Sequence, residues 1–329
     1  MNLKLLLKRG ALLAAANWPT IAIQFAAQTT FQMLLAVPIV GAAVLVAALV
    51  GGDLAELLRG SLREMFTTIA GALLSEPAAL VAFMTAFSLV LLGGSVLMFL
   101  VKGGTVEVLL AAELATGPIE HDALTYDTTI RHASRFTVER FITGCRRLFR
   151  RYLALGVALM VVYGASGGAY LMFVIYGYRA AAGGGRLFII GWTFIAALAA
   201  GVLVIWITLV NWMYLLVQIV VAAEDVGVAA GCARAARFVC GAFRGVAGIF
   251  GVIFALVLAA TLASALAWSG VGLIAFVPLV GLAVFPLQIA ALLLRGLVFQ
   301  YIGLTALAAY ASLYHATSRR LQPKPTTGE

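Results

Sequence analysis

Charged residues are scarce in this sequence. They make up 11% of its 329 residues, against roughly 25% in ordinary soluble domains. Apolar residues account for 64% instead. A soluble fold cannot bury that much apolar surface, so lipid must be the solvent for most of the chain. The composition excludes an ordinary soluble domain and predicts an all-α integral membrane protein.

Cysteines and catalytic motifs are equally scarce. Cys145, Cys232 and Cys240 form no CxxC pair, which excludes a disulfide framework and the usual zinc motifs. The sequence contains no GxSxG, HExxH or Walker pattern, and no two of its three histidines are spaced for a helix-borne metal site. We therefore predict a protein that is not an enzyme and that holds no cofactor and no metal.

The sequence lacks a full signal peptide. Its N-terminus is basic, but the apolar core after Arg9 is only ALLAAA, which is shorter than the about 7–15 residues that a signal requires. This favours a cytoplasmic amphipathic segment before the first span over a cleaved signal peptide.

Long apolar runs are abundant. Six of them approach or exceed the about 20 residues that a membrane span needs, roughly at 31–52, 78–101, 152–176, 188–222, 246–268 and 287–314. The fourth is so long that it must tilt, break near Gly201 or project into the cytoplasm. We expect one polytopic domain over 1–320 and a polar, disordered cytoplasmic tail over 321–329.

Basic residues set the expected orientation. They gather at the N-terminus, in the second and fourth connections between apolar runs, and in the C-terminal tail. The positive-inside rule places these segments in the cytoplasm. An even number of spans likewise puts both termini on one side. We predict a multi-pass inner-membrane protein with cytoplasmic N- and C-termini.

Two segments of the chain resemble each other. RFITGCRRL at 140–148 matches RFVCGAFRG at 237–245, and LLAAE at 109–113 resembles VVAAE at 220–224. The first copy carries a polar insertion, GPIEHDALTYDTT, and the basic N-terminal segment reads as a more divergent third copy. The pattern predicts internal repeats of an interfacial helix plus a helical hairpin, over about 1–102, 103–225 and 226–320.

The repeated arginines are the main candidates for ligand binding: Arg140, Arg147, Arg237 and Arg244. Phe141, Cys145 and Leu148 share one helical face, so the stretch predicts an amphipathic helix in the headgroup plane with arginines toward lipid phosphates. Specific binding of an anionic headgroup or a phosphorylated ligand is the alternative. Nucleic acid is disfavoured because no separate polar domain presents these arginines.

Glu113 and Glu224 occupy matching repeat positions. They are expected to form salt bridges with repeat arginines or to cap the following helix. A proton or cation site is the functional alternative.

Arg295 is the one charge well inside an apolar run, ALLLRGLVFQYIGL. A charge at that depth by default indicates function. Because the run is long, Arg295 can instead lie near the external interface and extend its guanidinium to water. We expect interface anchoring.

Residues 220–256, VVAAEDVGVAAGCARAARFVCGAFRGVAGIFGVIFAL, resemble a pattern in bacterial six-span membrane proteins. These include the membrane domain attached to some glycerophosphodiester phosphodiesterases and related uncharacterised families. In them a span ends at a carboxylate and glycine, here Glu224 and Gly227, before an alanine-rich basic helix. The Ser and Trp expected in that helix are absent. With no phosphodiesterase domain present, the resemblance implies architecture only.

The sequence thus favours a non-catalytic scaffold or accessory protein that organises lipid or a membrane partner. Its expected partners are anionic phospholipid and a membrane protein, but not nucleic acid. The alternative is a transporter or permease with a site near Arg295 between the repeats.

Overall fold

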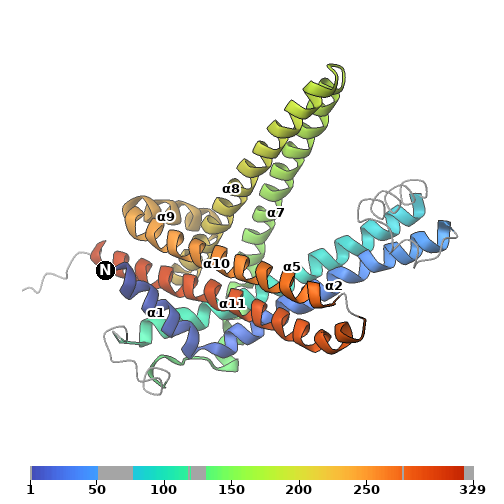
Figure 1. Cartoon of the computed structure of the whole chain (residues 1–329). Coiled ribbons are helices and arrows are strands. Elements are labelled where there is room, and N and C mark those ends of the chain that lie inside the picture. The colour runs from blue at the N-terminus through green and yellow to red at the C-terminus, as the bar shows by residue number, and fades with distance from the viewer. Residues whose placement is uncertain (1, 51–76, 118, 120–130, 276–277, 322–329) are drawn as a thin grey trace, which may run out of the picture. The chain divides into compact units, whose positions relative to one another are not determined.

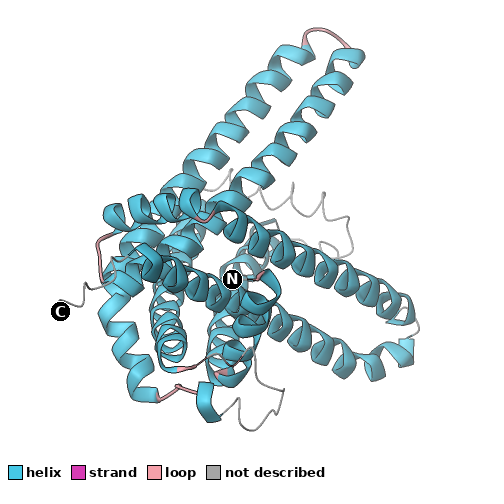
Figure 2. Cartoon of the chain, turned by 90° about the vertical axis from the view of Figure 1, so that its left-hand side faces the viewer, coloured by secondary structure: helices cyan, strands magenta, loops and turns pink. Residues whose placement is uncertain are grey.

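The computed structural model describes residues 2–50, 77–117, 119, 131–275 and 278–321. Over these residues the chain is helical and contains no strand (Figure 2). The predicted tail, apart from Leu321, and most of the predicted insertion at 117–129 lie outside the described residues.

Eight helices are defined (Figure 1). They are α1 (Leu3–Ala16), α2 (Trp18–Val50), α5 (Pro77–Ala115), α7 (Val138–Ala182), α8 (Arg186–Glu224), α9 (Val228–Gly241), α10 (Phe243–Ala275) and α11 (Pro278–Leu321). Six of them, all except α1 and α9, are long and apolar enough to cross a membrane. This confirms a helical chain with six candidate spans in the described part.

The apolar runs become helices because a helix satisfies its own backbone hydrogen bonds where water is absent. Local signals set the ends. Thr137 is the N-cap of α7 and accepts a hydrogen bond from the backbone N–H of Arg140 at 3.2 Å. Gly185 starts α8 with φ 89°, and Asp225 ends it in the left-handed region with φ 54°. Both conformations are typical of turn residues rather than helix interiors.

The chain divides into two compact units, which we describe separately. The smaller unit covers Ala22–Val101 and contains most of α2 and the first part of α5. Its two helices approach closely where the ring of Phe31 lies against Gly94. A β-carbon at position 94 would occupy the space of that ring.

The larger unit covers Met1–Ile21 and Lys102–Glu329. In it α7 packs against α8, α10 against α11, α1 along α11, and α9 against α8. The segment of α5 from Lys102 onward contacts the first turns of α7. Near that crossing a β-carbon on Gly103 would lie 3.2 Å from the carbonyl oxygen of Gly144, so the two backbones are almost in contact.

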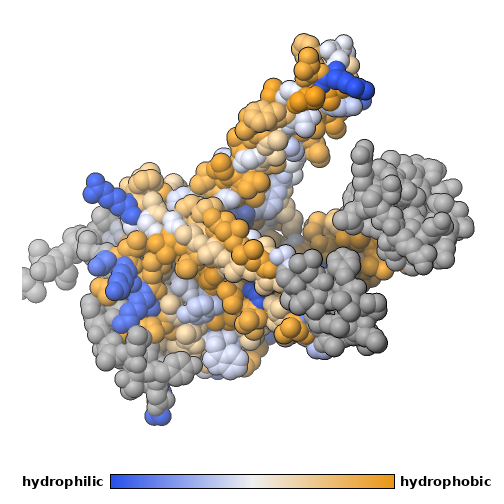
Figure 3. All heavy atoms as spheres, viewed as in Figure 1, coloured by the Kyte–Doolittle hydropathy of each residue, from blue (hydrophilic) through white to orange (hydrophobic). Residues whose placement is uncertain are grey.

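The buried core of the larger unit lies at the helix ends that carry charge. Its largest fully buried side chains include Leu13, Leu109, Leu148, Tyr152, Leu216, Ile249 and Tyr310. Farther along the same helices large apolar side chains are exposed, such as Phe194 of α8 and Leu266 of α10. Figure 3 shows this hydrophobic surface along the α7–α8 hairpin. Exposed apolar surface of this extent requires lipid.

The structure bears on two expectations about single helices. Of the three alternatives for the long fourth run, a break near Gly201 is excluded because α8 is continuous, and its last turns, from Tyr214 to Ala222, enter the core. The basic stretch after Arg140 is not a separate interfacial helix. It forms the first turns of α7, and its apolar face, including Phe141 and Leu148, packs on Gly103 and Gly104 of α5 rather than on lipid.

Candidate functional site

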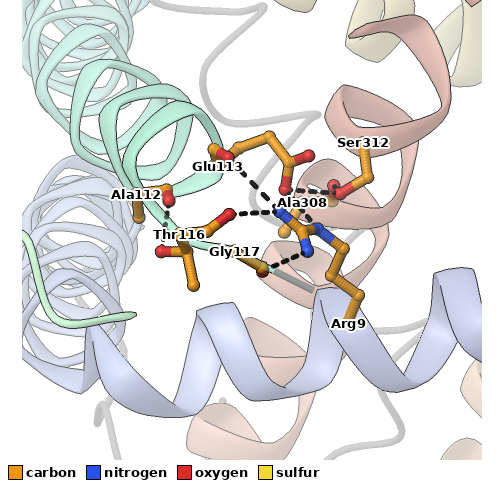
Figure 4. Close-up of polar contacts among 7 residues, drawn as sticks. All are labelled: Arg9, Ala112, Glu113, Thr116, Gly117, Ala308 and Ser312. Atoms are coloured by element: carbon orange, nitrogen blue, oxygen red, sulfur yellow. Dashed lines mark hydrogen bonds and ion pairs between the residues drawn. The ribbon is translucent and has the colours of Figure 1, made fainter. Parts of the chain in front are cut away.

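A buried arginine–carboxylate pair joins three helices of the larger unit (Figure 4). The guanidinium Nε of Arg9 in α1 lies 2.8 Å from Oε2 of Glu113 in α5, and their side chains are only 8% and 9% exposed. The hydroxyl of Ser312 in α11 donates to the same carboxylate oxygen at 2.7 Å. Glu113 therefore has both an ionic and a neutral partner, as a buried carboxylate requires.

Arg9 also closes the C-terminal end of α5. Its Nη atoms donate to the carbonyl oxygens of Gly117 at 2.8 Å, Thr116 at 3.0 Å and Glu113 at 3.3 Å. The last carbonyls of a helix have no partner within the helix, and they carry partial negative charge. One guanidinium thus satisfies the end of α5 and neutralises its last acidic residue. Both charged side chains are almost wholly buried, which suits a structural role (Figure 4).

Asn17 forms a second buried junction between α1 and α2. Its side-chain amide donates to the carbonyl oxygens of Leu13 at 2.9 Å and Ala133 at 3.0 Å. Its Oδ1 accepts from the backbone N–H of Arg135 at 2.8 Å. The Asn17 side chain therefore caps the end of α1 and links it by hydrogen bonds to the segment that precedes α7.

A second carboxylate site surrounds Glu224, the last residue of α8. Arg234 of α9 forms an ion pair with Oε2 of Glu224, and the hydroxyl of Tyr314 in α11 donates to Oε1. The ring of Phe238 packs edge-to-face on Tyr314, with centroids 5.0 Å apart. In contrast to the Glu113 site, this site opens into a pocket of about 430 Å³ that is also lined by Arg237.

The arginines of α7 form further ion pairs at the edge of the core. Arg147 lies 2.6 Å from Glu107 of α5 and also donates to the carbonyl oxygen of Ala222 at 3.3 Å. Arg151 pairs with Asp225, and its hydrogen bonds hold the pKa of that carboxyl below its usual value. Because a carboxyl with a lowered pKa stabilises the fold only while ionised, this contribution is lost as the pH falls through that pKa.

The predicted site residues therefore divide into two groups. Glu113 and Glu224 form ion pairs with Arg9 and Arg234, which are not among the four candidate arginines, and Arg147 pairs with Glu107. Arg140 donates to the carbonyl oxygen of Arg135, whereas Arg237 and Arg244 are exposed. Arg244 follows the break between α9 and α10, so it lies on a different helix from Arg237.

Sequence reasoning missed several residues of these sites, among them Arg9, Asn17, Glu107, Ser312 and Tyr314. Arg9 and Lys102 were counted only as cytoplasmic positive charges. In the structure the ammonium of Lys102 lies over the ring of Tyr214, 5.0 Å from its centroid. No signal in the sequence pointed to Ser312 or Tyr314, because hydroxyl residues at a helix end resemble any polar boundary.

Arg295 lies on the exposed surface of α11, with its guanidinium carbon 5.7 Å from the ring centroid of Phe299. No pocket of the described residues that we identify is lined by it. We expect Arg295→Leu and Arg295→Lys both to unfold within about 1 kcal/mol of wild type, because no buried partner is left without a charge. Thermal unfolding in detergent measures this, and a large loss in both variants would contradict the interface reading.

The charged sites consist of arginine, carboxylate and hydroxyl groups that contact one another. Among the described residues no three His, Cys, Asp or Glu side chains come together as metal ligands. The carboxylates Glu113 and Glu224 are each occupied by an arginine and a hydroxyl. The arrangement can hold helices together and present guanidinium groups to an anion.

No protein-family model, curated protein or solved structure matches the chain. The resemblance to the six-span membrane domains noted from 220–256 stays a prediction.

Proposed function

We propose that this chain is a multi-pass inner-membrane protein that acts as a non-catalytic scaffold and organises anionic phospholipid. The observation that carries the proposal is the position of Arg140, Arg237 and Arg244. Each lies where a charged helix end meets an apolar span, and none pairs with a carboxylate in the described part of the chain. Each arginine in such a position contributes about 1 kcal/mol of binding free energy to an anionic lipid surface.

The ion pairs between helices hold in place the helix ends that carry the lipid-binding arginines. Arg9, Arg147 and Arg234 each hold a carboxylate of another helix, which fixes the helix ends around them. The exposed apolar surface of α7, α8 and α10 supplies the membrane attachment. A scaffold of this kind needs no reacting groups, only a fixed display of cations at the lipid surface.

Internal repetition is part of the proposal and is supported by the helix lengths. Both α1 and α9 have 14 residues, and after a single intervening residue each is followed by a long apolar helix, α2 or α10. Arg9 and Arg234 stand at the same position within their helices, and they pair with the matching carboxylates Glu113 and Glu224. Repeats of a short helix plus a hairpin account for both regularities.

The orientation is tested by reporter fusions. We expect a fusion at Gly231 to report the cytoplasm and a fusion at Gly184 to report the outside, because basic residues concentrate around the first position and not the second. A cytoplasmic signal at Gly184 would overturn the topology.

Lipid retention tests the function. The protein is purified and placed in bilayers of a defined mixture of phosphatidylglycerol and phosphatidylcholine. The amounts of the two lipids that it retains are then compared by native mass spectrometry. We expect enrichment of the anionic lipid, and its loss in the triple variant of Arg140, Arg237 and Arg244 to Gln.

The matched control is Arg179→Gln with Arg186→Gln, two exposed arginines beside the turn at Gly183–Gly185. These two substitutions remove charge from the other end of the α7–α8 hairpin, and they should leave the enrichment of anionic lipid unchanged. Equal retention of both lipids by the wild type would reject the proposed function.

A further inference from the structure

The pocket beside Glu224 differs in kind from the other hollows of the larger unit. The two pockets along α7 and α8 have almost wholly apolar linings, including Leu187 and Phe188 in one and Leu203 in the other. The pocket of about 430 Å³ between the ends of α8, α9 and α11 is instead lined by charge and hydroxyl groups together with Phe238. A volume of this size accommodates a phosphate and the small group that it esterifies.

Charge in this pocket favours an anion. Glu224 is already neutralised by the ion pair with Arg234 and by the hydroxyl of Tyr314. Arg237 adds a second guanidinium that pairs with no carboxylate in the described residues. The remaining charge of the lining is therefore positive, and guanidinium groups bind phosphate oxygens in a planar, two-bond geometry.

The Arg9–Glu113 and Arg234–Glu224 sites differ in how many partners each guanidinium has. At Arg9 the guanidinium is fully occupied by Glu113 and three carbonyl oxygens at the end of α5. Within the described part of the chain, the Arg234 guanidinium donates to Glu224 alone, and 40% of its side chain is exposed. The same arrangement of arginine, carboxylate and hydroxyl is thus sealed by protein at one site and open at the other.

The open side and the apolar wall of this pocket fit a phosphate ester. A β-carbon on Gly241 would meet no atom within 4 Å, so this side of the pocket is open. Phe238, held edge-to-face on Tyr314, offers an apolar wall for a glycerol or alkyl group. The hydroxyl of Thr317 donates to the carbonyl oxygen of Leu313 at 2.9 Å, and Ser318 is hydrogen-bonded to Tyr314, so recognition of a ligand rests on the arginines.

We propose that this pocket binds the phosphate group of an anionic phosphate ester, with Arg237 as the primary ligand and Arg234 as the second, positioned by Glu224. The proposal rests on the proposed function in one respect, since it names the class of molecule that the basic surface selects. A phospholipid headgroup and a soluble glycerol phosphate share this chemistry.

The experiment uses the full chain in nanodiscs. In one arm, retained phosphatidylglycerol is measured by native mass spectrometry. In the other, binding of soluble glycerol 3-phosphate is measured in discs of phosphatidylcholine alone. We expect Arg237→Gln to weaken whichever ligand binds by about tenfold or more, because a charge-assisted pair is lost. Arg237→Lys should weaken it less, and Gly241→Leu, which fills the pocket without changing charge, should weaken it comparably to Arg237→Gln.

Arg244→Gln is the matched control, because Arg244 is also exposed but does not line the pocket. It should change glycerol 3-phosphate binding by less than about twofold and lower phosphatidylglycerol retention less than Arg237→Gln does. Anionic enrichment that falls equally in Arg237→Gln and Arg244→Gln would overturn the pocket but leave the proposed function standing. Absence of binding in both arms of the wild type would overturn both proposals. Binding in only one arm, with dependence on Arg237, supports the site and identifies its ligand as lipid or soluble.

Discussion

Replacement of Arg9 by methionine is expected to destabilise the protein by about 3–5 kcal/mol. The reason is that Glu113 would remain buried with no cationic partner, and the carbonyl oxygens of Thr116 and Gly117 would lose their donor. Equilibrium unfolding in mixed micelles, followed by circular dichroism, measures the loss. Proper insertion of the variant is checked by its retention in the membrane fraction.

Variants at two other positions separate the charge effect from simple loss of contact. Glu113→Gln should cost less than Arg9→Met, because the amide oxygen still accepts from Ser312 and Arg9 keeps its carbonyl partners. Arg234→Met removes the repeat-related pair. Since that pair is 40% and 30% exposed, it should cost no more than about 1 kcal/mol. Equal losses for Arg9→Met and Arg234→Met would show that burial does not distinguish the two pairs.

The general architecture could be predicted because lipid imposes simple rules. Runs of about 20 apolar residues must be helical in a bilayer, and the part of the chain that the structure describes has six helices of that kind. The residues predicted on the apolar face of the segment after Arg140 were also correct, since Phe141, Cys145 and Leu148 are all buried. Periodicity indicates which residues turn away from water, and these residues do so.

What covers such a face could not be predicted from periodicity. Phe141 packs on Gly104 rather than on lipid, because two adjacent glycines in α5 allow the backbones of α5 and α7 to approach. An arginine near the end of an apolar run likewise looks the same whether it binds a phosphate or a carboxylate. Arg9 and Glu113 are 104 positions apart, and no local pattern connects them.

The matching AAE segments did carry information about the site. They place Glu113 and Glu224 at matching sequence positions, and both carboxylates accept from an arginine and from a hydroxyl of α11. Arg9 was overlooked because the N-terminal segment shares too few identical residues with the segment around Arg234 to be aligned with it. Its position is recognised only when the lengths of α1 and α9 are compared.

The closest approach of α1 to α11 gives the second large expected effect. Gly10 lies at this crossing, and a β-carbon there would stand 2.6 Å from the carbonyl oxygen of Thr305 and 2.9 Å from the backbone nitrogen of Ala309. Backbone atoms at those distances cannot rotate away, so α1 must shift. We expect Gly10→Ala to lose about 1–3 kcal/mol in the same unfolding measurement, although alanine is by itself the better helix former.

Gly164→Ala in α7 is the matched control for Gly10→Ala. A β-carbon at position 164 meets no atom within 4 Å, so only the gain in helix propensity, up to about 1 kcal/mol, should remain. The two substitutions add the same methyl group to helical glycines, yet their effects on stability should have opposite signs. Because Arg9 precedes Gly10, a shift of α1 also lengthens the contact of Arg9 with Glu113, so combining Gly10→Ala with Arg9→Met should cost less than the sum of the two. Strict additivity would mean that α1 is held on α11 independently of its ion pair with α5.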